Sequence, residues 1–127
     1  MTENIKEINA DDFQREVLDQ KRVVVDFYST ECPPCEALAS KYDALSEIYG
    51  EYIPFIKIFR QGNRELASSL DITGSPTVIF YEDGKIVGDK LTGGIRRSEL
   101  MKNLDALLTE TERAAVHAKI QPYETET

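Results

Sequence analysis

Residues 22–38 read RVVVDFYSTECPPCEAL, and this stretch decides the fold. An apolar run begins with three valines, carries Asp26, and continues through Phe27 and Tyr28. β-branched and aromatic residues in a short apolar run favour a strand buried on both faces, so we expect such a strand over 23–28. A short polar turn follows, and Cys32 and Cys35 then stand at the start of a helical pattern.

Cys32 and Cys35 are the only cysteines of the chain, and they lie three positions apart. At that spacing a disulfide opens and closes with little backbone movement. A helix N-terminus supplies unsatisfied N–H groups and the positive end of the helix dipole, and both stabilise a thiolate. The stretch therefore predicts a redox-active dithiol.

Other interpretations of the cysteine pair stay open. A tetrahedral zinc or an iron–sulfur cluster needs four ligands, and the chain has no second cysteine pair and one histidine, His117. Two subunits sharing their paired motifs would supply four thiolates, so a metal-bridged or iron–sulfur-bridged dimer remains an alternative. A redox-inactive binding module that holds its partner noncovalently is another. His117 itself is expected to be a solvated surface residue.

The composition predicts one soluble globular domain of 127 residues. Acidic residues outnumber basic ones by 23 to 15, which gives a net charge of −8. This balance argues against nucleic acid and anionic membrane surfaces as partners. Residues 1–8 show no cationic region followed by an apolar stretch, so we expect no signal peptide and a cytoplasmic protein. We also expect a monomer.

The remaining pattern predicts alternating strands and helices. An edge strand is expected near 5–8, a helix carrying Phe13 and Val17 next, and a strand over 53–59. The helix after the cysteines has apolar residues at spacings of three and four and is expected to end with Gly50 as a left-handed cap. A short helix over about 64–71 should carry Leu66 and Leu70 on its apolar face.

The second half of the chain predicts a hairpin and a final helix. Asp83-Gly84 between two apolar runs predicts antiparallel strands over 77–81 and 85–87. A helix should begin near Arg96 and turn its leucines at 100, 104, 107 and 108 to the core. We expect a domain of residues 1–108 and a helical extension with a polar tail over 109–127. The alanine pattern at 114, 115 and 118 fades before Pro122, and residues 123–127 are expected to be disordered.

The element order, with Val-Asp-Phe before Cys-x-x-Cys and a later Gly-Ser-Pro-Thr, resembles the thioredoxin family. The resemblance covers about residues 4–108. It implies an α/β thioredoxin fold, a mixed five-stranded sheet flanked by helices. It further implies a protein-disulfide reductase that needs no bound cofactor, takes disulfide-containing proteins as substrates, and receives electrons from a reductase.

The resemblance also assigns roles to single residues. Cys32 would be the exposed attacking thiol and Cys35 the more buried resolving thiol. Pro76 would be a cis-proline facing the disulfide, and Ser75 would offer its backbone to an extended substrate. Gly93 would keep the groove open, and Pro33 and Pro34 would complete the substrate-binding set.

Asp26 has a physical case of its own. An acid inside an apolar strand is expected to be buried, and desolvation raises the pKa of a carboxyl. Such a carboxyl beneath the two sulfurs can accept the proton of Cys35. Lys57 alternates with Phe55 and Phe59 and is expected to point into the same region. An Asp26–Lys57 salt bridge without catalytic duty remains the alternative.

The stretch departs from the usual Trp-Cys-Gly-Pro-Cys-Lys of the family. The chain has no tryptophan, and Glu31 and Glu36 flank the cysteines. Pro33 removes a backbone N–H near the Cys32 sulfur. The two carboxylates oppose the helix dipole and are expected to raise the pKa of the Cys32 thiol, which predicts a reductant of disulfides rather than an oxidant of dithiols.

Overall fold

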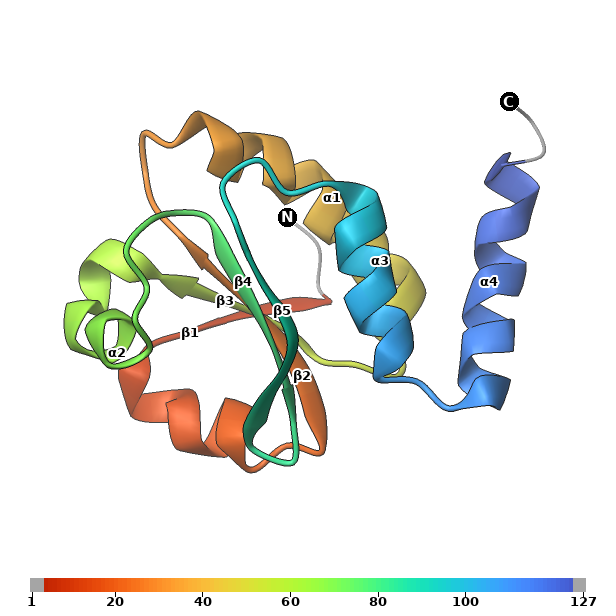
Figure 1. Ribbon diagram of the computed structural model, residues 1–127, viewed down its shortest axis with the longest axis horizontal. Helices are drawn as coiled ribbons and strands as arrows, with labels where there is room; N and C mark the ends of the chain where they lie inside the picture. Colours follow the sequence, from red (N-terminus) through yellow and green to blue (C-terminus); the bar gives the residue numbers. More distant parts are fainter. Residues whose placement is uncertain (1–3, 125–127) are drawn as a thin grey trace.

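The computed structural model describes residues 4–124, with side chains to residue 120. Five strands and four α-helices alternate with short 3-10 and π segments (Figure 1). In chain order they are β1 Ile5–Ile8, the 3-10 turn Ala10–Asp12, the π-helix Gln14–Leu18, β2 Arg22–Tyr28, α1 Pro33–Tyr49, β3 Phe55–Phe59, the 3-10 turn Arg60–Gly62, α2 Arg64–Ser69, β4 Thr77–Glu82, β5 Lys85–Thr92, α3 Arg97–Ala106 and α4 Glu110–Glu124.

The strands form one mixed sheet in the order β1-β3-β2-β4-β5. β2 pairs in parallel with β3 and antiparallel with β4, so the strand that leads to the cysteines lies at the centre. The predicted hairpin is confirmed, because β4 and β5 pair antiparallel around Asp83 and Gly84. The mixed five-stranded sheet flanked by helices is the fold that the sequence predicted.

Alternation along β2 divides the core into two layers. Val24 faces the helices α1 and α3, whereas Val23, Val25 and Phe27 face the other side, which the N-terminal turns and α2 cover (Figure 1). Since successive side chains of a strand point to opposite faces, Asp26 lies on the face of Val24, beneath α1. The sheet thus positions this carboxyl on the side of the cysteine helix.

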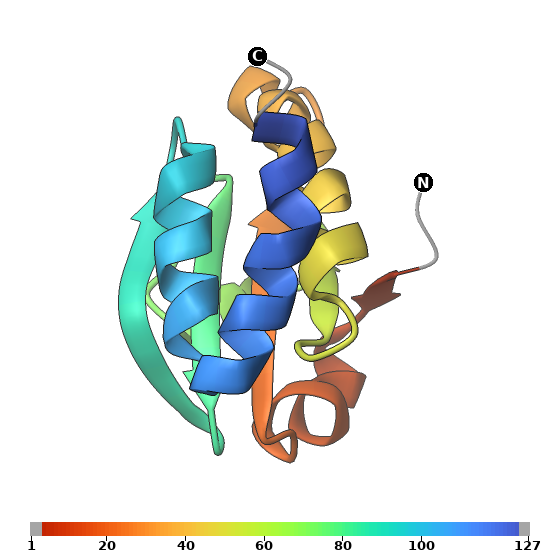
Figure 2. The ribbon, with the colours of Figure 1, turned by 90° about the vertical axis from the view of Figure 1, so that its right-hand side faces the viewer.

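α4 covers the seam between α1 and α3 (Figure 2). Val116 and Ile120 are buried there, in the same core cluster as Leu104 of α3 and the leucines that follow it. Arg22 of β2 reaches the helix and donates to both carboxylate oxygens of Glu112 at 2.7 Å, and to the carbonyl oxygens of Tyr52 and Leu107. The pairing with Arg22 lowers the pKa of Glu112 to about 2. The described part of α4 is therefore packed onto the domain.

Several sequence-based expectations need correction. The segment with Phe13 and Val17 is a 3-10 turn followed by a π-helix, although both side chains are buried as expected. Gly50 has φ −62° and is not left-handed, since the chain continues into a turn in which Tyr52 and Ile53 both donate to the Tyr49 carbonyl. The short helix ends at Ser69, and Ala67 is its buried residue while Leu66 and Leu70 are partly buried.

The C-terminal part also differs from the expectation. β5 runs to Thr92, well beyond 87. α4 includes Pro122 and extends to Glu124, and its buried face is Val116 and Ile120, while Ala114, Ala115 and Ala118 are exposed. Of the segment 123–127 expected to be disordered, 125–127 lie outside the described residues. The boundary at 108 stays a prediction. No helix in the described part combines the length and apolarity that a membrane span requires.

Candidate active site

The two sulfurs lie at the first turn of α1 and are joined as a disulfide, with their Cα atoms 5.2 Å apart. Cys32 is the extended N-cap residue, and Pro33 and Pro34 occupy the first two helical positions. Prolines fit there because the N–H groups of a first turn have no partner within the helix. The Cys35 N–H is then the first backbone donor, and it lies 3.3 Å from the Cys32 sulfur.

Both sulfurs are nearly covered in this disulfide-bonded form. Cys32 is 9% exposed and Cys35 is 7% exposed. The expectation of an exposed Cys32 is therefore wrong for the oxidised protein, and the two cysteines differ little in burial. Cys32 lies at the mouth of the turn because it is the N-cap, whereas Cys35 lies within the helix.

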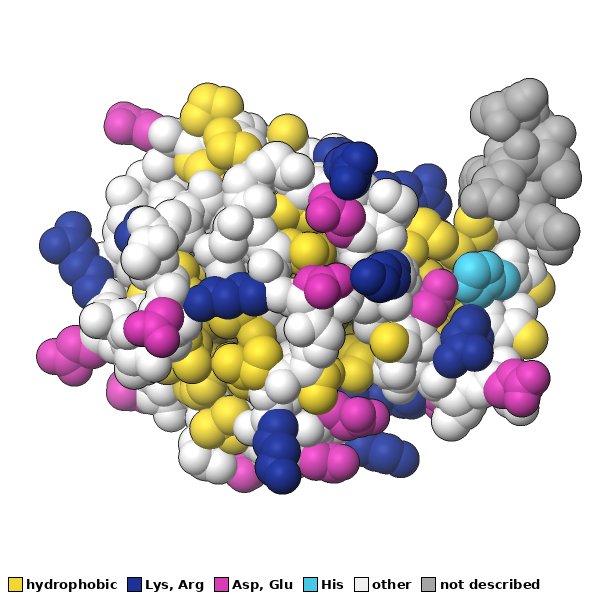
Figure 3. Space-filling view, viewed as in Figure 1, with side chains coloured by type: hydrophobic (Ala, Val, Ile, Leu, Met, Phe, Trp, Pro, Cys, Tyr) yellow, Lys and Arg dark blue, Asp and Glu magenta, His cyan; other side chains and the backbone are white. Residues whose placement is uncertain are grey.

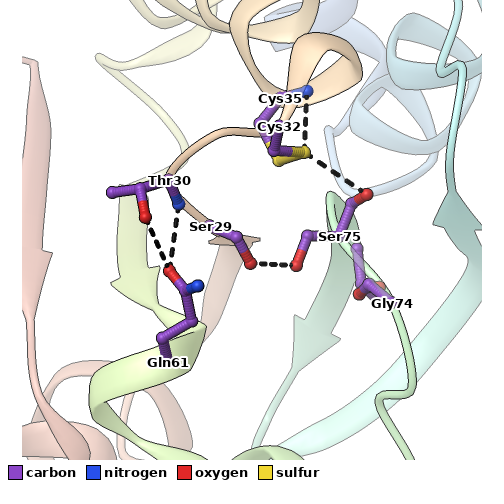
Figure 4. Close-up of a disulfide and its surroundings, with 8 residues drawn as sticks. Ser29, Thr30, Cys32, Cys35, Gln61, Gly74 and Ser75 are labelled. Carbon is purple, nitrogen blue, oxygen red and sulfur yellow. Dashed lines mark hydrogen bonds between the residues drawn. A yellow bond between two sulfur atoms is a disulfide. The ribbon is translucent and has the colours of Figure 1, made fainter.

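The loop before β4 faces the disulfide. The Ser75–Pro76 bond is cis, and the Ser75 carbonyl oxygen lies 3.6 Å from the Cys32 sulfur (Figure 4). Thr77 donates from its hydroxyl to the Gly74 carbonyl, and the Gly93 N–H donates to the Pro76 carbonyl. Gly93 has φ +74°, in the left-handed region that favours glycine. The predicted substrate-binding residues are thus gathered around Cys32, while their roles stay predictions.

The sequence did not single out Ser29, Thr30 and Gln61. The Ser29 hydroxyl hydrogen-bonds the Ser75 hydroxyl, which links the loop after β2 to the cis-proline loop (Figure 4). Gln61 accepts hydrogen bonds from the Thr30 N–H at 3.0 Å and from the Thr30 hydroxyl at 3.1 Å. These side chains hold the turn that presents Cys32. Their only signal in the sequence is a polar run directly after a buried strand.

Asp26 is buried as expected, with 2% of its surface exposed. Its Oδ1 atom has no hydrogen-bond partner within the described chain. Burial raises the pKa of Asp26 to about 7, and the charge of Lys57 opposes this rise. A carboxyl with that pKa can both hold and release a proton near neutral pH.

Lys57 pairs in register with Asp26 across β2 and β3, but no ion pair between these two side chains is formed within the described chain. The Lys57 ammonium instead lies 4.5 Å from the centre of the Tyr28 ring. Tyr28 donates its hydroxyl to the Glu7 carboxylate. Burial, together with Glu7, raises the pKa of Tyr28 to about 12. The alternative of an Asp26–Lys57 salt bridge is thus not seen, and Lys57 instead makes a cation–π contact with a residue that the sequence had not assigned to the site.

Glu31 and Glu36 are both exposed beside the disulfide. Glu31 has φ +51°, so the residue before Cys32 is in a conformation that side chains other than glycine rarely adopt. Among the residues that the structure describes, no group of three or more His, Cys, Asp or Glu side chains could hold a metal ion.

Comparisons with known proteins agree on one family. The family model for thioredoxin matches residues 4–106. The chain is 35% identical over 106 residues to the chloroplastic thioredoxin X of Arabidopsis thaliana, covering 82% of this chain and 58% of that protein. It is 38% identical over 87 residues to a thioredoxin of Acetoanaerobium sticklandii, covering 68% of this chain and 82% of the relative.

A solved structure agrees. The thioredoxin of Malassezia sympodialis superposes with a TM-score of 0.73 at 25% identity, covering 80% of this chain and 89% of that one. Members of the family exchange disulfides through the cysteine pair itself, so no bound cofactor is required. With the matched model, the relatives and the Cys32–Cys35 disulfide in agreement, this chain belongs to the thioredoxin family of thiol–disulfide oxidoreductases.

Proposed function

We propose that this protein reduces disulfides of protein substrates, with Cys32 as the attacking and Cys35 as the resolving thiol. The observation that carries the proposal is the Cys32–Cys35 pair at the first turn of α1, facing the Ser75 carbonyl of the cis-proline loop. A substrate strand that lies along Ser75 brings its disulfide in line with the Cys32 sulfur.

The reaction proceeds through a mixed disulfide. The Cys32 thiolate attacks one substrate sulfur, forms a bond to it, and releases the other sulfur as a thiolate. Cys35 then attacks Cys32, closes the Cys32–Cys35 disulfide, and releases the first substrate sulfur. The substrate gains two electrons and the protein loses two. A reductase or dithiol of the cell must return those electrons before the next turnover.

Asp26 serves the second step in this proposal. Cys35 must lose its proton before it attacks Cys32, and a carboxyl of pKa about 7 beneath the helix is an acceptor at neutral pH. The free Oδ1 atom supports this role, because it leaves one acceptor unoccupied. A water molecule between the two groups would carry the proton.

The direction of electron flow follows from the charges around Cys32. The thiolate has the Cys35 N–H as a donor at 3.3 Å, while Pro33 and Pro34 offer none. The exposed carboxylates of Glu31 and Glu36 disfavour a further negative charge. A poorly stabilised thiolate favours the disulfide form, which makes the protein a reductant. Such a reductant suits the cytoplasm, where thiols are kept reduced, and we propose that it works there as an electron carrier.

A trapping experiment tests the assignment. With Cys35→Ser, the mixed disulfide between Cys32 and a protein substrate should accumulate, because no resolving thiol remains. The matched Cys32→Ser variant should trap no substrate. Equal trapping by both variants would contradict the assigned order of attack.

Equilibration with dithiothreitol and glutathione buffers, followed by thiol counting, tests the direction. A single two-electron transition well below the glutathione couple supports a reductase. A potential at or above that of glutathione contradicts the charge argument. The absence of any transition would favour the noncovalent binding module instead.

A further inference from the structure

A second site lies next to the disulfide. A surface pocket of about 560 Å³ opens between the turn Arg60–Gly62, α2 and the chain that leads to the cis-proline loop. Arg60 and Arg64 line it together with Asp71 and Thr73. The pocket has a net positive charge, because it is lined by two guanidinium groups and one carboxylate.

The arginines of this pocket lack partners. Within the described chain, neither side chain forms an ion pair or a hydrogen bond, and the Nε atom of Arg60 is buried without an acceptor. Most other arginines are paired: Arg15 with Asp12 and Glu16, Arg22 with Glu112, and Arg96 with Glu99. A buried donor without an acceptor is costly unless something outside the chain satisfies it. The guanidinium groups of Arg60 and Arg64 therefore give the pocket the donors of an anion site, and no acceptor of the described chain is bonded to them.

This positive charge is local. The protein carries a net charge of −8, and on the face shown in Figure 3 basic and acidic side chains are interspersed rather than gathered into one basic field. Glu31 and Glu36 are exposed next to the two cysteines in the sequence. An acidic group arriving with a substrate is thus repelled beside the cysteines and attracted at the pocket.

Two connections join the pocket to the active site. Gln61, which also lines the pocket, accepts hydrogen bonds from the backbone and hydroxyl of Thr30, two residues before Cys32. Thr73 lies two residues before Ser75, whose carbonyl faces the Cys32 sulfur. An extended chain advances about 3.3 Å per residue, so a substrate bound along Ser75 carries side chains a few residues from its cysteine toward the pocket.

We propose that Arg60 and Arg64 bind the carboxylate of an Asp or Glu side chain that lies a few residues from the disulfide cysteine of a protein substrate. This inference rests on the proposed disulfide reductase function. Arginine suits the task, because its planar guanidinium donates two parallel hydrogen bonds to a carboxylate. Asp71 lines the same pocket and competes with the incoming carboxylate. The pocket thus selects substrates with an acidic residue near the disulfide.

The test compares disulfide peptides that carry Glu, Gln or Lys at each of the four positions on either side of the cysteine. For the wild-type protein, kcat/KM for Glu should exceed that for Gln about fivefold at one or two positions, as expected for a partly exposed charge-assisted contact. Lys should be the poorest at those positions, and 0.5 M salt should remove most of the preference. Equal values for all three peptides at every position would overturn the proposal.

Three variants distinguish the effect of the pocket residues on substrate choice from the effect of the net charge of the protein. Arg60→Gln/Arg64→Gln should bring the Glu/Gln ratio close to one, whereas Asp71→Asn should raise it. Lys21→Gln/Lys85→Gln removes the same charge from exposed positions just before β2 and at the start of β5, and it should leave the ratio unchanged. Persistence of the ratio in the arginine variant, or its equal loss in the lysine variant, contradicts the assignment. Reduction of the Gln peptide by the wild-type protein reports separately on the proposed function.

Discussion

The fold disfavours the charged form of the buried Asp26 carboxyl. Because its pKa is raised to about 7, the folded protein holds the proton while the unfolded chain releases it near pH 4. Stability from this group is fully present below the unfolded pKa and is lost as the pH rises through about 7.

We therefore expect Asp26→Asn to be more stable than the wild type at pH 8, by on the order of 4 kcal/mol, and nearly equal to it at pH 4. Urea unfolding of both proteins at the two pH values measures this difference. A constant difference across the pH range would show that the carboxyl does not titrate with a raised pKa.

Lys57 tunes that titration from its place over the Tyr28 ring. The ammonium lowers the pKa of Asp26, so Lys57→Met should move the Asp26 titration to higher pH, by up to about one pH unit. Carbon-13 NMR of the Asp26 carboxyl follows this shift. Tyr28→Phe is the matched control, because it keeps the ring under Lys57 and loses only the hydroxyl bond to Glu7. A shift in the control equal to that of Lys57→Met would exclude the ammonium as the cause.

Single residues were predictable from the sequence where one pattern governed them. An acid in an apolar strand could only be buried, and two cysteines before a helical pattern could only lie at its first turn. The partner of Lys57 was not predictable. The alternation of side chains along a strand predicts the face of the sheet on which Lys57 lies. Whether its ammonium contacts Asp26 or the Tyr28 ring depends on the packing of the folded protein.

At the scale of elements, α4 is held by buried side chains as well as by the Arg22–Glu112 pair. Ile120 is 2% exposed within the core cluster that also holds residues of α1 and α3, and truncating a buried isoleucine to alanine costs about 2–4 kcal/mol. We expect Ile120→Ala to lower the urea midpoint and to speed amide exchange in α4. Ala118→Ser, on the exposed face of the same helix, should change stability by less than about 0.5 kcal/mol. Equal exchange in both variants would mean that α4 does not depend on this contact.

Elements were predictable where hydrophobic spacing was strong, as in β2, the hairpin and α1. A helical extension after residue 108 was predicted, but its contact face was not, because that face is made by Val116 and Ile120 and by the Arg22–Glu112 pair from a distant strand. The π-helix of residues 14–18 was also hidden, since its buried spacing resembles that of an α-helix. Both concern local geometry that tertiary contacts decide.

For the whole molecule, the direction of electron flow is linked to stability. If the protein is a reductant, the folded state must favour the disulfide over the dithiol more than the unfolded state does. We expect the oxidised protein to be more stable than the reduced protein by at least about 2 kcal/mol, which is the amount that closing so short a loop contributes. Urea unfolding with and without dithiothreitol measures the difference. A more stable reduced form would identify an oxidant.

The fold as a whole was predictable because the order of elements and the spaced motifs agreed with one family. The pocket of Arg60 and Arg64 was not predictable from the sequence. The two arginines are four positions apart in a polar stretch, and they form a pocket only because the fold brings Asp71 and Thr73 next to them. A site formed by loops that are brought together by the fold produces no periodic pattern of residues from which it could be predicted.

The strand order leaves β5 at an open edge of the sheet, and this affects how molecules behave in crowded solution. β5 exposes Ile86, and an exposed apolar edge strand can pair with the same strand of a second copy. The strand also carries the exposed charges of Lys85 and Lys90 and a register irregularity in its pairing with β4, and both disfavour such pairing. We therefore expect single molecules at millimolar concentration, and growing clusters for Lys85→Val/Lys90→Val, as measured by light scattering. The charges on this edge would then keep single molecules from pairing strand to strand.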